Sequence, residues 1–195
     1  MKKIIIICLL NIATGAFLSA QNVIWSDDFE GDKGWQILES KNYSVEYTKE
    51  GRLEMESEDA GPYISSCRTN LNPIKNFSIM VEAITEKGLK EGEYFGIAFN
   101  FLDRNNYYYF CVEEGYAYFY EIKNGEKVRY EYDVVKKTKD KTFNLELKKI
   151  GTHVMFLVND EEVLYIESIE IKSSKVGLYV AGKTKIAFDN IRIMQ

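Results

Sequence analysis

The stretch that decides the fold runs from residue 94 to residue 120 and reads YFGIAFNFLDRNNYYYFCVEEGYAYFY. Its first part is apolar at every second position, and we expect these side chains to share one face: Phe95, Ile97, Phe99 and Phe101. Asn100 then belongs to the opposite face, together with Gly96 and Ala98. Because successive side chains of a β-strand point to opposite faces, this period of two predicts a strand with one face in the core.

The second part of the stretch is rich in tyrosine. Alternation puts one set of side chains on the face away from the core: Tyr109, Cys111 and Glu113 in one strand, and Tyr116, Tyr118 and Tyr120 in the next. Tyrosine rings combine flat apolar area with a polar handle, which suits the CH faces of sugars, whereas cross-strand packing is the alternative. The candidate ligand-binding residues are Asn100, Tyr109, Glu113, Tyr118 and Tyr120.

The same alternation recurs on both sides of this stretch, for example at Phe143, Leu145 and Leu147. Turn signals separate the runs: Glu50-Gly51, Glu114-Gly115, Asn124-Gly125, Asn159-Asp160 and Gly182-Lys183. Asn-Gly is the strongest of these, since both residues tolerate the positive φ of a type I′ turn. We therefore expect about twelve to fourteen short strands and no amphipathic helix, which is typical of a single all-β sandwich domain.

Composition excludes several classes of function. The chain has 195 residues, a net charge of -5 and one histidine. A negative net charge disfavours binding to a phosphate backbone, so nucleic acid is not an expected partner. A single histidine excludes most multi-histidine zinc sites.

The first twenty residues are predicted to be a signal peptide. Lysines stand at positions 2 and 3, an apolar stretch follows, and Ser19-Ala20 closes the segment, so we expect cleavage between Ala20 and Gln21. Polar residues and a glycine interrupt the apolar stretch, which is shorter than the roughly 18 to 20 residues of a membrane span. The sequence thus predicts an exported domain, residues 21–195, in the periplasm, at the cell surface or in the medium. Export permits a disulfide between Cys67 and Cys111, and two separate buried thiols are the alternative.

Motifs at both ends of the chain complete the pattern: residues 25–35 read WSDDFEGDKGW, residues 175–180 read KVGLYV and residues 188–193 read FDNIRI. Together with residues 94–110, and in this order, they resemble the concanavalin A-like lectin and glucanase superfamily, especially its laminin-G-like and 3-keto-disaccharide-hydrolase-like domains. The resemblance covers the whole of residues 21–195. It implies a jelly-roll sandwich of two antiparallel sheets, one of them curved, with a concave face that often binds carbohydrate.

The resemblance does not by itself imply catalysis. Retaining glucanases of the superfamily carry a Glu-x-Asp-x-Glu strand, which residues 95–114 do not contain. The one alternating set of acids, at positions 54, 56 and 58, lies opposite Leu53 and Met55, so we expect a solvated face. His153 stands alone, and no Gly-x-Ser-x-Gly motif is present.

Calcium is a further expectation that rests on the resemblance. Glucanases of the superfamily often hold a structural Ca²⁺ between an N-terminal acid, a backbone carbonyl beside an early glycine, and an aspartate near the C-terminus. Asp189 and Gly51 match the last two by position, and either Asp28 or Glu30 matches the first. The alternative is that Asp189 bonds the backbone of a bulge, which the three-residue step from Phe188 to the next apolar residue predicts.

The sequence therefore predicts an exported, non-catalytic carbohydrate-binding module. A sugar hydrolase of the 3-keto-disaccharide type is one alternative. A structural or protein-interaction domain without a sugar ligand is the other.

Overall fold

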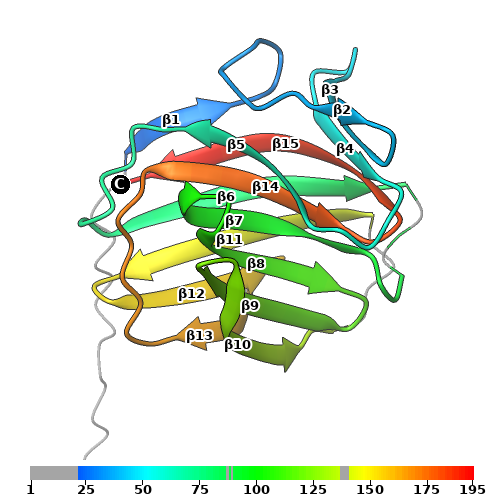
Figure 1. Ribbon diagram of the computed structural model, residues 1–195. Helices are drawn as coiled ribbons and strands as arrows, with labels where there is room; N and C mark the ends of the chain where they lie inside the picture. The colour runs from blue at the N-terminus through cyan, green and yellow to red at the C-terminus, as the bar shows by residue number, and fades with distance from the viewer. Residues whose placement is uncertain (1–21, 87, 89, 137–140) are drawn as a thin grey trace, which may run out of the picture.

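The computed structural model describes residues 22–86, 88, 90–136 and 141–195, which form two antiparallel sheets packed face to face (Figure 1). The predicted signal peptide, residues 1–20, lies outside the described residues. The order in the nine-stranded sheet is β13 (Glu161–Ile166), β12 (His153–Val158), β11 (Thr142–Ile150), β6 (Phe77–Thr85), β15 (Thr184–Met194), β4 (Leu53–Ser57), β3 (Tyr43–Tyr47) and β2 (Glu39–Ser40), with β1 (Val23–Asp27) paired to β15. The order in the six-stranded sheet is β10 (Glu126–Val134), β9 (Tyr116–Lys123), β8 (Asn106–Glu113), β7 (Tyr94–Asp103), β14 (Lys175–Ala181) and β5 (Tyr63–Arg68).

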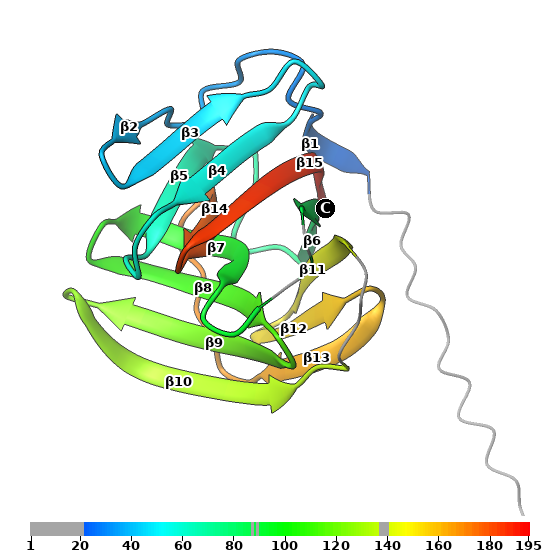
Figure 2. The ribbon, with the colours of Figure 1, turned by 90° about the vertical axis from the view of Figure 1, so that its right-hand side faces the viewer.

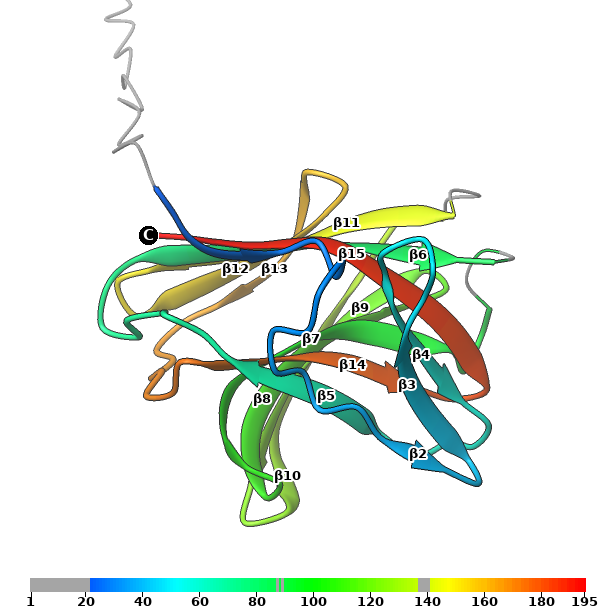
Figure 3. The ribbon, with the colours of Figure 1, turned by 90° about the horizontal axis from the view of Figure 1, so that it is seen from above.

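The two sheets form separate layers when the molecule is seen from above, with β15, β6 and β11 in one and β14, β5 and β8 in the other (Figure 3). Consecutive strands β7, β8, β9 and β10 follow one another across the six-stranded sheet (Figure 2). This architecture confirms the predicted sandwich of two antiparallel sheets. None of the described segments forms a helix with the length and apolar character needed to cross a membrane.

The core lies between the layers and comes from the alternating residues of both sheets. Phe143, Leu145 and Leu147 are buried as their spacing predicts, and so are Leu53 and Met55. The rings packed there bury the largest apolar areas and include Phe77, Phe95, Phe99, Phe110, Phe119, Phe156 and Phe188. On the other face of β4, Glu54 and Glu56 pair with Lys185 at 2.7 and 3.7 Å, a structural use of these acids.

Four of the five predicted turns join neighbouring strands of one sheet, as at Gly51 between β3 and β4, and the fifth, at Gly182-Lys183, leads from β14 in one sheet to β15 in the other. Asn124 and Gly125 both have positive φ, at 53° and 81°, in the hairpin of β9 and β10. The described residues form fifteen strands, slightly more than expected, because short segments such as β1 and β2 also join the nine-stranded sheet.

The face of Phe101 was predicted incorrectly. Asn100 has a φ of 50°, and the pairing of β7 with β8 shifts register between Phe99 and Asp103. This bulge turns Phe101 away from the core, and its ring centroid lies 5.4 Å from that of Tyr107. Asparagine adopts positive φ more readily than other residues, which makes the bulge possible but not obvious from the alternation.

Cys67 and Cys111 are both free and buried, so the second alternative for the cysteines holds. Cys67 belongs to the core between the sheets, whereas Cys111 packs on the outer face of the six-stranded sheet. Side chains on opposite faces of one sheet cannot meet in a disulfide.

β10 forms one edge of the six-stranded sheet, and its pairing with β9 is irregular. Lys127 lies opposite Ile122 and Arg129 lies opposite Glu121, so Val128 is an extra residue on the edge strand. A bulge of this kind bends the strand and interrupts its regular row of backbone groups.

Substitution of Gly96 tests how closely β7 and β8 approach. A Cβ at position 96 would lie 1.9 Å from the carbonyl oxygen of Phe110, a backbone atom that cannot move alone. We expect Gly96→Ala to lower the free energy of unfolding by about 3 kcal/mol, at the upper end of overpacking costs. Gly31→Ala is the matched control, since a Cβ at Gly31 meets nothing within 4 Å. Equal urea midpoints for the two variants would contradict the close approach.

Candidate functional site

The outer face of the six-stranded sheet is covered by tyrosines. Alternation in β8 and β9 sends Phe110 and Phe119 into the core and leaves the intervening tyrosines outside, as predicted. We call this surface the tyrosine face, and its rings are Tyr94, Tyr107, Tyr109, Tyr116, Tyr118, Tyr120, Tyr130, Tyr132 and Tyr179. Tyr130 and Tyr132 on β10 were not predicted, although they pair in register with Tyr120 and Tyr118.

Tyr109 is buried, not exposed as a sugar platform would require. Its ring lies between those of Tyr120 and Tyr179, with centroids 4.6 and 4.5 Å apart and planes within 18° of parallel. Both faces of the Tyr109 ring are therefore covered, and the side chain is only 7% exposed. Tyr118 and Tyr120 are half-buried. The rings of this stack serve cross-strand packing first.

Glu113 anchors the start of β7. Its carboxylate accepts hydrogen bonds from the Gly92 amide at 2.7 Å and from the Tyr118 hydroxyl at 2.8 Å. Burial, followed by the interaction with Glu113, raises the pKa of Tyr118 well above its ordinary value. The same two causes raise the pKa of Tyr94 to about 12. These hydroxyls stay protonated, so they can donate hydrogen bonds throughout the neutral range.

The outermost rings of the tyrosine face are the accessible ones. Tyr132 is 58% exposed and Tyr130 is 46% exposed. The Lys127 ammonium lies 3.9 Å from the centroid of the Tyr120 ring, a cation–π contact that covers part of that ring. Tyr116 on β9 is 41% exposed as well, so aromatic contact with a ligand is available over β10 and the adjoining start of β9.

Asn100 is occupied by the loop that precedes β14. Its Oδ1 accepts hydrogen bonds from the amides of Lys172 and Ser173 at 2.8 and 3.1 Å. Its Nδ2 donates to the carbonyl of Glu170 at 3.2 Å. The side chain is 6% exposed and holds the connection between the sheets, so its structural use is clear.

A cleft of about 620 Å³ opens beside the tyrosine face, at the end of β7 where the bulge lies. We call it the side cleft, and its lining residues are Gln36, Leu38, Glu39, Ser40, Tyr43, Pro62, Tyr63, Ile64, Phe101, Asp103, Arg104, Tyr107 and Lys175. Tyr107 and Ile64 also pack against the apolar cluster of the tyrosine face, so the two surfaces are continuous. Local sequence patterns do not reveal this cleft, because its walls come from segments far apart in the chain.

Comparison with known proteins bears on the fold. No model of a protein family matches the chain, and no curated protein sequence matches it. Among solved structures, the carbohydrate binding module CBM66 from Bacillus subtilis is similar with a TM-score of 0.63 at 16% identity, over 84% of this chain and 96% of that one. The β-glucanase of Bacillus licheniformis has a TM-score of 0.61 at 10% identity, over 88% of this chain and 97% of its own. Sheep galectin-11, solved with glycerol, has a TM-score of 0.51 at 15% identity, over 68% of this chain and 97% of its own.

These likenesses show that the fold is a jelly-roll β-sandwich, as the resemblance predicted. At such low identity they carry no assignment of ligand to this chain.

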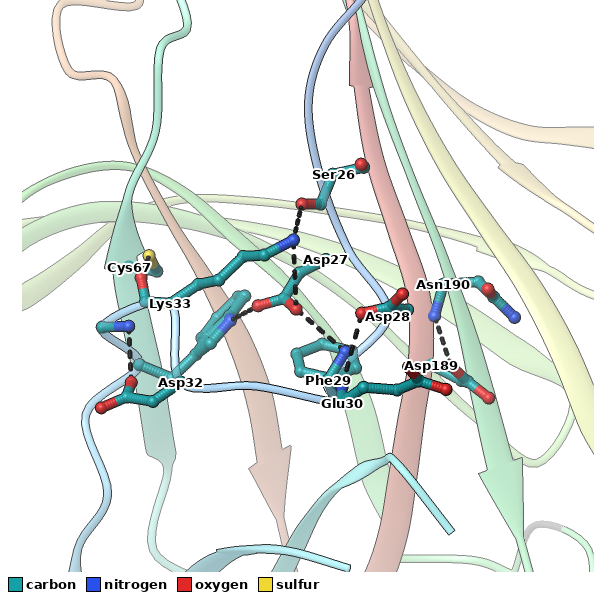
Figure 4. A network of polar contacts seen from close by, with 12 residues as sticks. Ser26, Asp27, Asp28, Phe29, Glu30, Asp32, Lys33, Cys67, Asp189 and Asn190 are labelled. Carbon is teal, nitrogen blue, oxygen red and sulfur yellow. Dashed lines mark hydrogen bonds and ion pairs between the residues drawn. The ribbon is translucent and has the colours of Figure 1, made fainter.

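Figure 4 shows Asp28, Glu30 and Asp189 of the predicted calcium residues around the N-terminal turn, which a different aspartate organises. Asp27, which is 1% exposed, accepts hydrogen bonds from the Phe29 amide at 2.9 Å and from Trp35 Nε1 at 2.8 Å. Lys33 lies 3.7 Å from the same carboxylate. Asp27 was not among the predicted site residues, because its partners become apparent only in the folded turn.

Some of the candidate calcium ligands already have partners within the protein. A Cβ at Gly51 would lie 3.2 Å from Cγ of Glu30 and 3.8 Å from the carbonyl oxygen of Asp28, so these three residues do meet. Asp189 accepts the Asn190 amide at 2.8 Å within the predicted bulge, and its Oδ2 lies 3.5 Å from Nε of Arg52. Among the residues described, no group of three or more Asp, Glu, His or Cys side chains could hold a metal. Calcium stays a prediction that relies on backbone carbonyls.

Melting curves test the calcium prediction. An ion bound only to the folded state raises its stability by mass action, so we expect Tm to rise in millimolar Ca²⁺. Asp189→Asn should abolish the rise, while Glu54→Gln, on a neighbouring strand, should keep it. Identical melting of chelator-treated and calcium-loaded protein would show that no stabilising Ca²⁺ is bound. Asp189 would then serve only to bond the backbone of its bulge and to pair with Arg52.

Alkaline titration tests the burial of the tyrosine face. Burial raises the pKa of Tyr109, Tyr120 and Tyr179 above the ordinary value of about 10. Above about pH 10 the unfolded chain therefore binds fewer protons than the folded one, and stability falls as pH rises. Tyrosinate absorbance of the folded protein should lag behind that of the protein in urea. Coincident titration curves would show the rings to be exposed.

Proposed function

We propose that this protein is an exported carbohydrate-binding module. The observation that carries the proposal is the tyrosine face, which ends in a cleft lined by both aromatic and hydrogen-bonding side chains. Sugars offer apolar CH patches and many hydroxyls, and such mixed walls match both. Export follows the expectation from residues 1–20 and belongs to the proposal.

The similar solved structures support this reading, since one is named a carbohydrate binding module and another is a galectin. The acidic side chains on the tyrosine face offer little for hydrolysis. Glu113 already accepts bonds from Gly92 and Tyr118, which leaves it a structural carboxylate in the free protein. We therefore favour binding over catalysis.

A panel of immobilised neutral and acidic polysaccharides tests the proposal. We expect the wild-type domain to be retained by at least one of them. Tyr130→Ala and Tyr132→Ala should each weaken that binding by about 1 kcal/mol or more, the cost of losing a well-placed aromatic contact.

Tyr165→Ala is the matched control, because Tyr165 is 45% exposed on β13 in the other sheet. It should bind like the wild type. If none of the polysaccharides retains the wild-type domain, the proposed function is wrong. Unchanged affinity in both tyrosine-face variants would remove that face from the site.

A further inference from the structure

We propose that the open end of the tyrosine face binds a polysaccharide that carries ammonium groups, that is, an amino sugar polymer whose amines are free. The open end consists of Tyr116 on β9 and of Tyr130 and Tyr132 on β10. This inference rests on the proposed function and adds to it the chemical class of the sugar and the residues that recognise it.

The three rings of the open end are accessible and lie next to one another. Tyr116, Tyr130 and Tyr132 are all exposed. The centroids of Tyr130 and Tyr132 are 5.6 Å apart, and those of Tyr116 and Tyr132 are 6.4 Å apart with planes inclined at 60°. A cation attracted to an aromatic face lies within about 6 Å of the ring centroid, so one ammonium group can contact two neighbouring rings at this spacing.

A cation of the protein itself makes such a contact on the adjoining part of the face. The Lys127 ammonium lies 3.9 Å from the centroid of Tyr120 and 5.7 Å from that of Tyr130, two rings whose centroids are 4.9 Å apart. Among the residues that the structure describes, no lysine or arginine makes the same contact with Tyr116 or Tyr132. These two rings are therefore available to a cation from outside.

A buried negative charge lies beside the open end. Glu113 is buried, and its carboxylate accepts hydrogen bonds from Gly92 and Tyr118 but forms no ion pair with any lysine or arginine in the described part of the chain. The centroid of the Tyr118 ring lies 6.1 Å from that of Tyr116 and 6.3 Å from that of Tyr132. A buried charge is screened less than an exposed one, so Glu113 attracts a cation to these rings.

The charge of the surrounding strands favours the same kind of ligand. Residues 94–134, which include β7 to β10 and their turns, contain seven acidic and four basic residues, and the whole chain carries a net charge of -5. Burial, followed by the neighbouring Tyr132, raises the pKa of Tyr130, and the charge of Glu113 adds to this rise. The field of Glu113 thus reaches β10. Such a surface attracts a cationic polymer and repels an acidic one.

An amino sugar polymer combines the two properties that this surface selects. Its sugar rings present CH groups that pack on tyrosine, and its ammonium groups are cations that the ring faces and Glu113 attract. A neutral sugar offers only the first property. A lysine-rich protein segment offers only the second, and oligolysine is therefore included in the test.

The test extends the polysaccharide panel by two soluble hexasaccharides of the same linkage, one of N-acetylglucosamine and one of glucosamine. They differ in whether the nitrogen is acetylated or free. Calorimetry with the wild-type protein, at low salt and at a mildly acidic pH that keeps the amines charged, measures both affinities. We expect the glucosamine hexamer to bind at least about two- to fivefold more tightly, the effect of one exposed cation–π contact. Added salt should reduce this preference.

Three variants locate the effect. Tyr132→Leu keeps an apolar side chain but removes the aromatic face, so the preference for the charged hexamer should fall. Glu113→Gln removes the charge and keeps an amide that can form hydrogen bonds with Gly92 and Tyr118, so the preference should fall here too while the melting temperature reports on folding. Tyr165→Leu, an exposed tyrosine of the other sheet, is the matched control and should keep the full preference.

The outcomes separate this inference from the proposed function. If neither hexamer and no polysaccharide of the panel binds, both are wrong. If sugars bind but the glucosamine hexamer binds no more tightly than its acetylated counterpart, only this inference is wrong, and the same holds if Tyr132→Leu and Glu113→Gln both keep the full preference. Oligolysine that competes with the glucosamine hexamer at equal affinity would show that the cation alone is recognised, which overturns the amino sugar as the ligand class.

Discussion

The outer surface of the six-stranded sheet depends on how little side chain β7 carries there. Gly96 has no side chain because the backbone of β8 occupies the space, and Ala98 two residues on has a single methyl group. Since this strip of β7 is bare, Tyr109 and Tyr179 reach over it from the strands on either side and stack. The other rings of the face then pack outward from that pair. A larger residue on this strip would separate the two halves of the sheet surface.

The bulge at Asn100 converts the end of the same strand into a different surface. The Asn100 side chain forms hydrogen bonds with backbone groups of residues 170–173, and these bonds fix the loop that leads into β14. The displaced Phe101 leaves the core and becomes a wall of the side cleft. Asn100, a single residue with positive φ, thus determines both the position of this loop and the position of Phe101 in the wall of the cleft. Such irregularities often occur where a sheet must aim a side chain at a ligand.

Much of this structure can be predicted from the alternation of apolar and other residues along each strand, which has a period of two residues. Alternation alone identified the core residues of β11 and β4 and the outward set of β9, because one face of each strand is buried. It could not tell that Tyr109 would be covered, since Tyr179 lies 70 residues away in the sequence and joins it only through the order of strands. It also could not find the side cleft, whose walls come from segments far apart in the chain. Local patterns specify faces, whereas contacts between distant strands specify sites.

The bulge in β10 has a consequence for the solution behaviour of the protein. This strand ends its sheet with exposed Tyr130, Tyr132 and Val134, a combination that in a flat, regular strand invites another chain to add to the edge and begin aggregation. The extra residue at Val128 breaks the spacing of the free backbone groups, so an incoming strand cannot form a continuous ladder. The exposed rings of β10 therefore lie beside an interrupted row of free backbone groups, and removal of Val128 would leave a straighter edge.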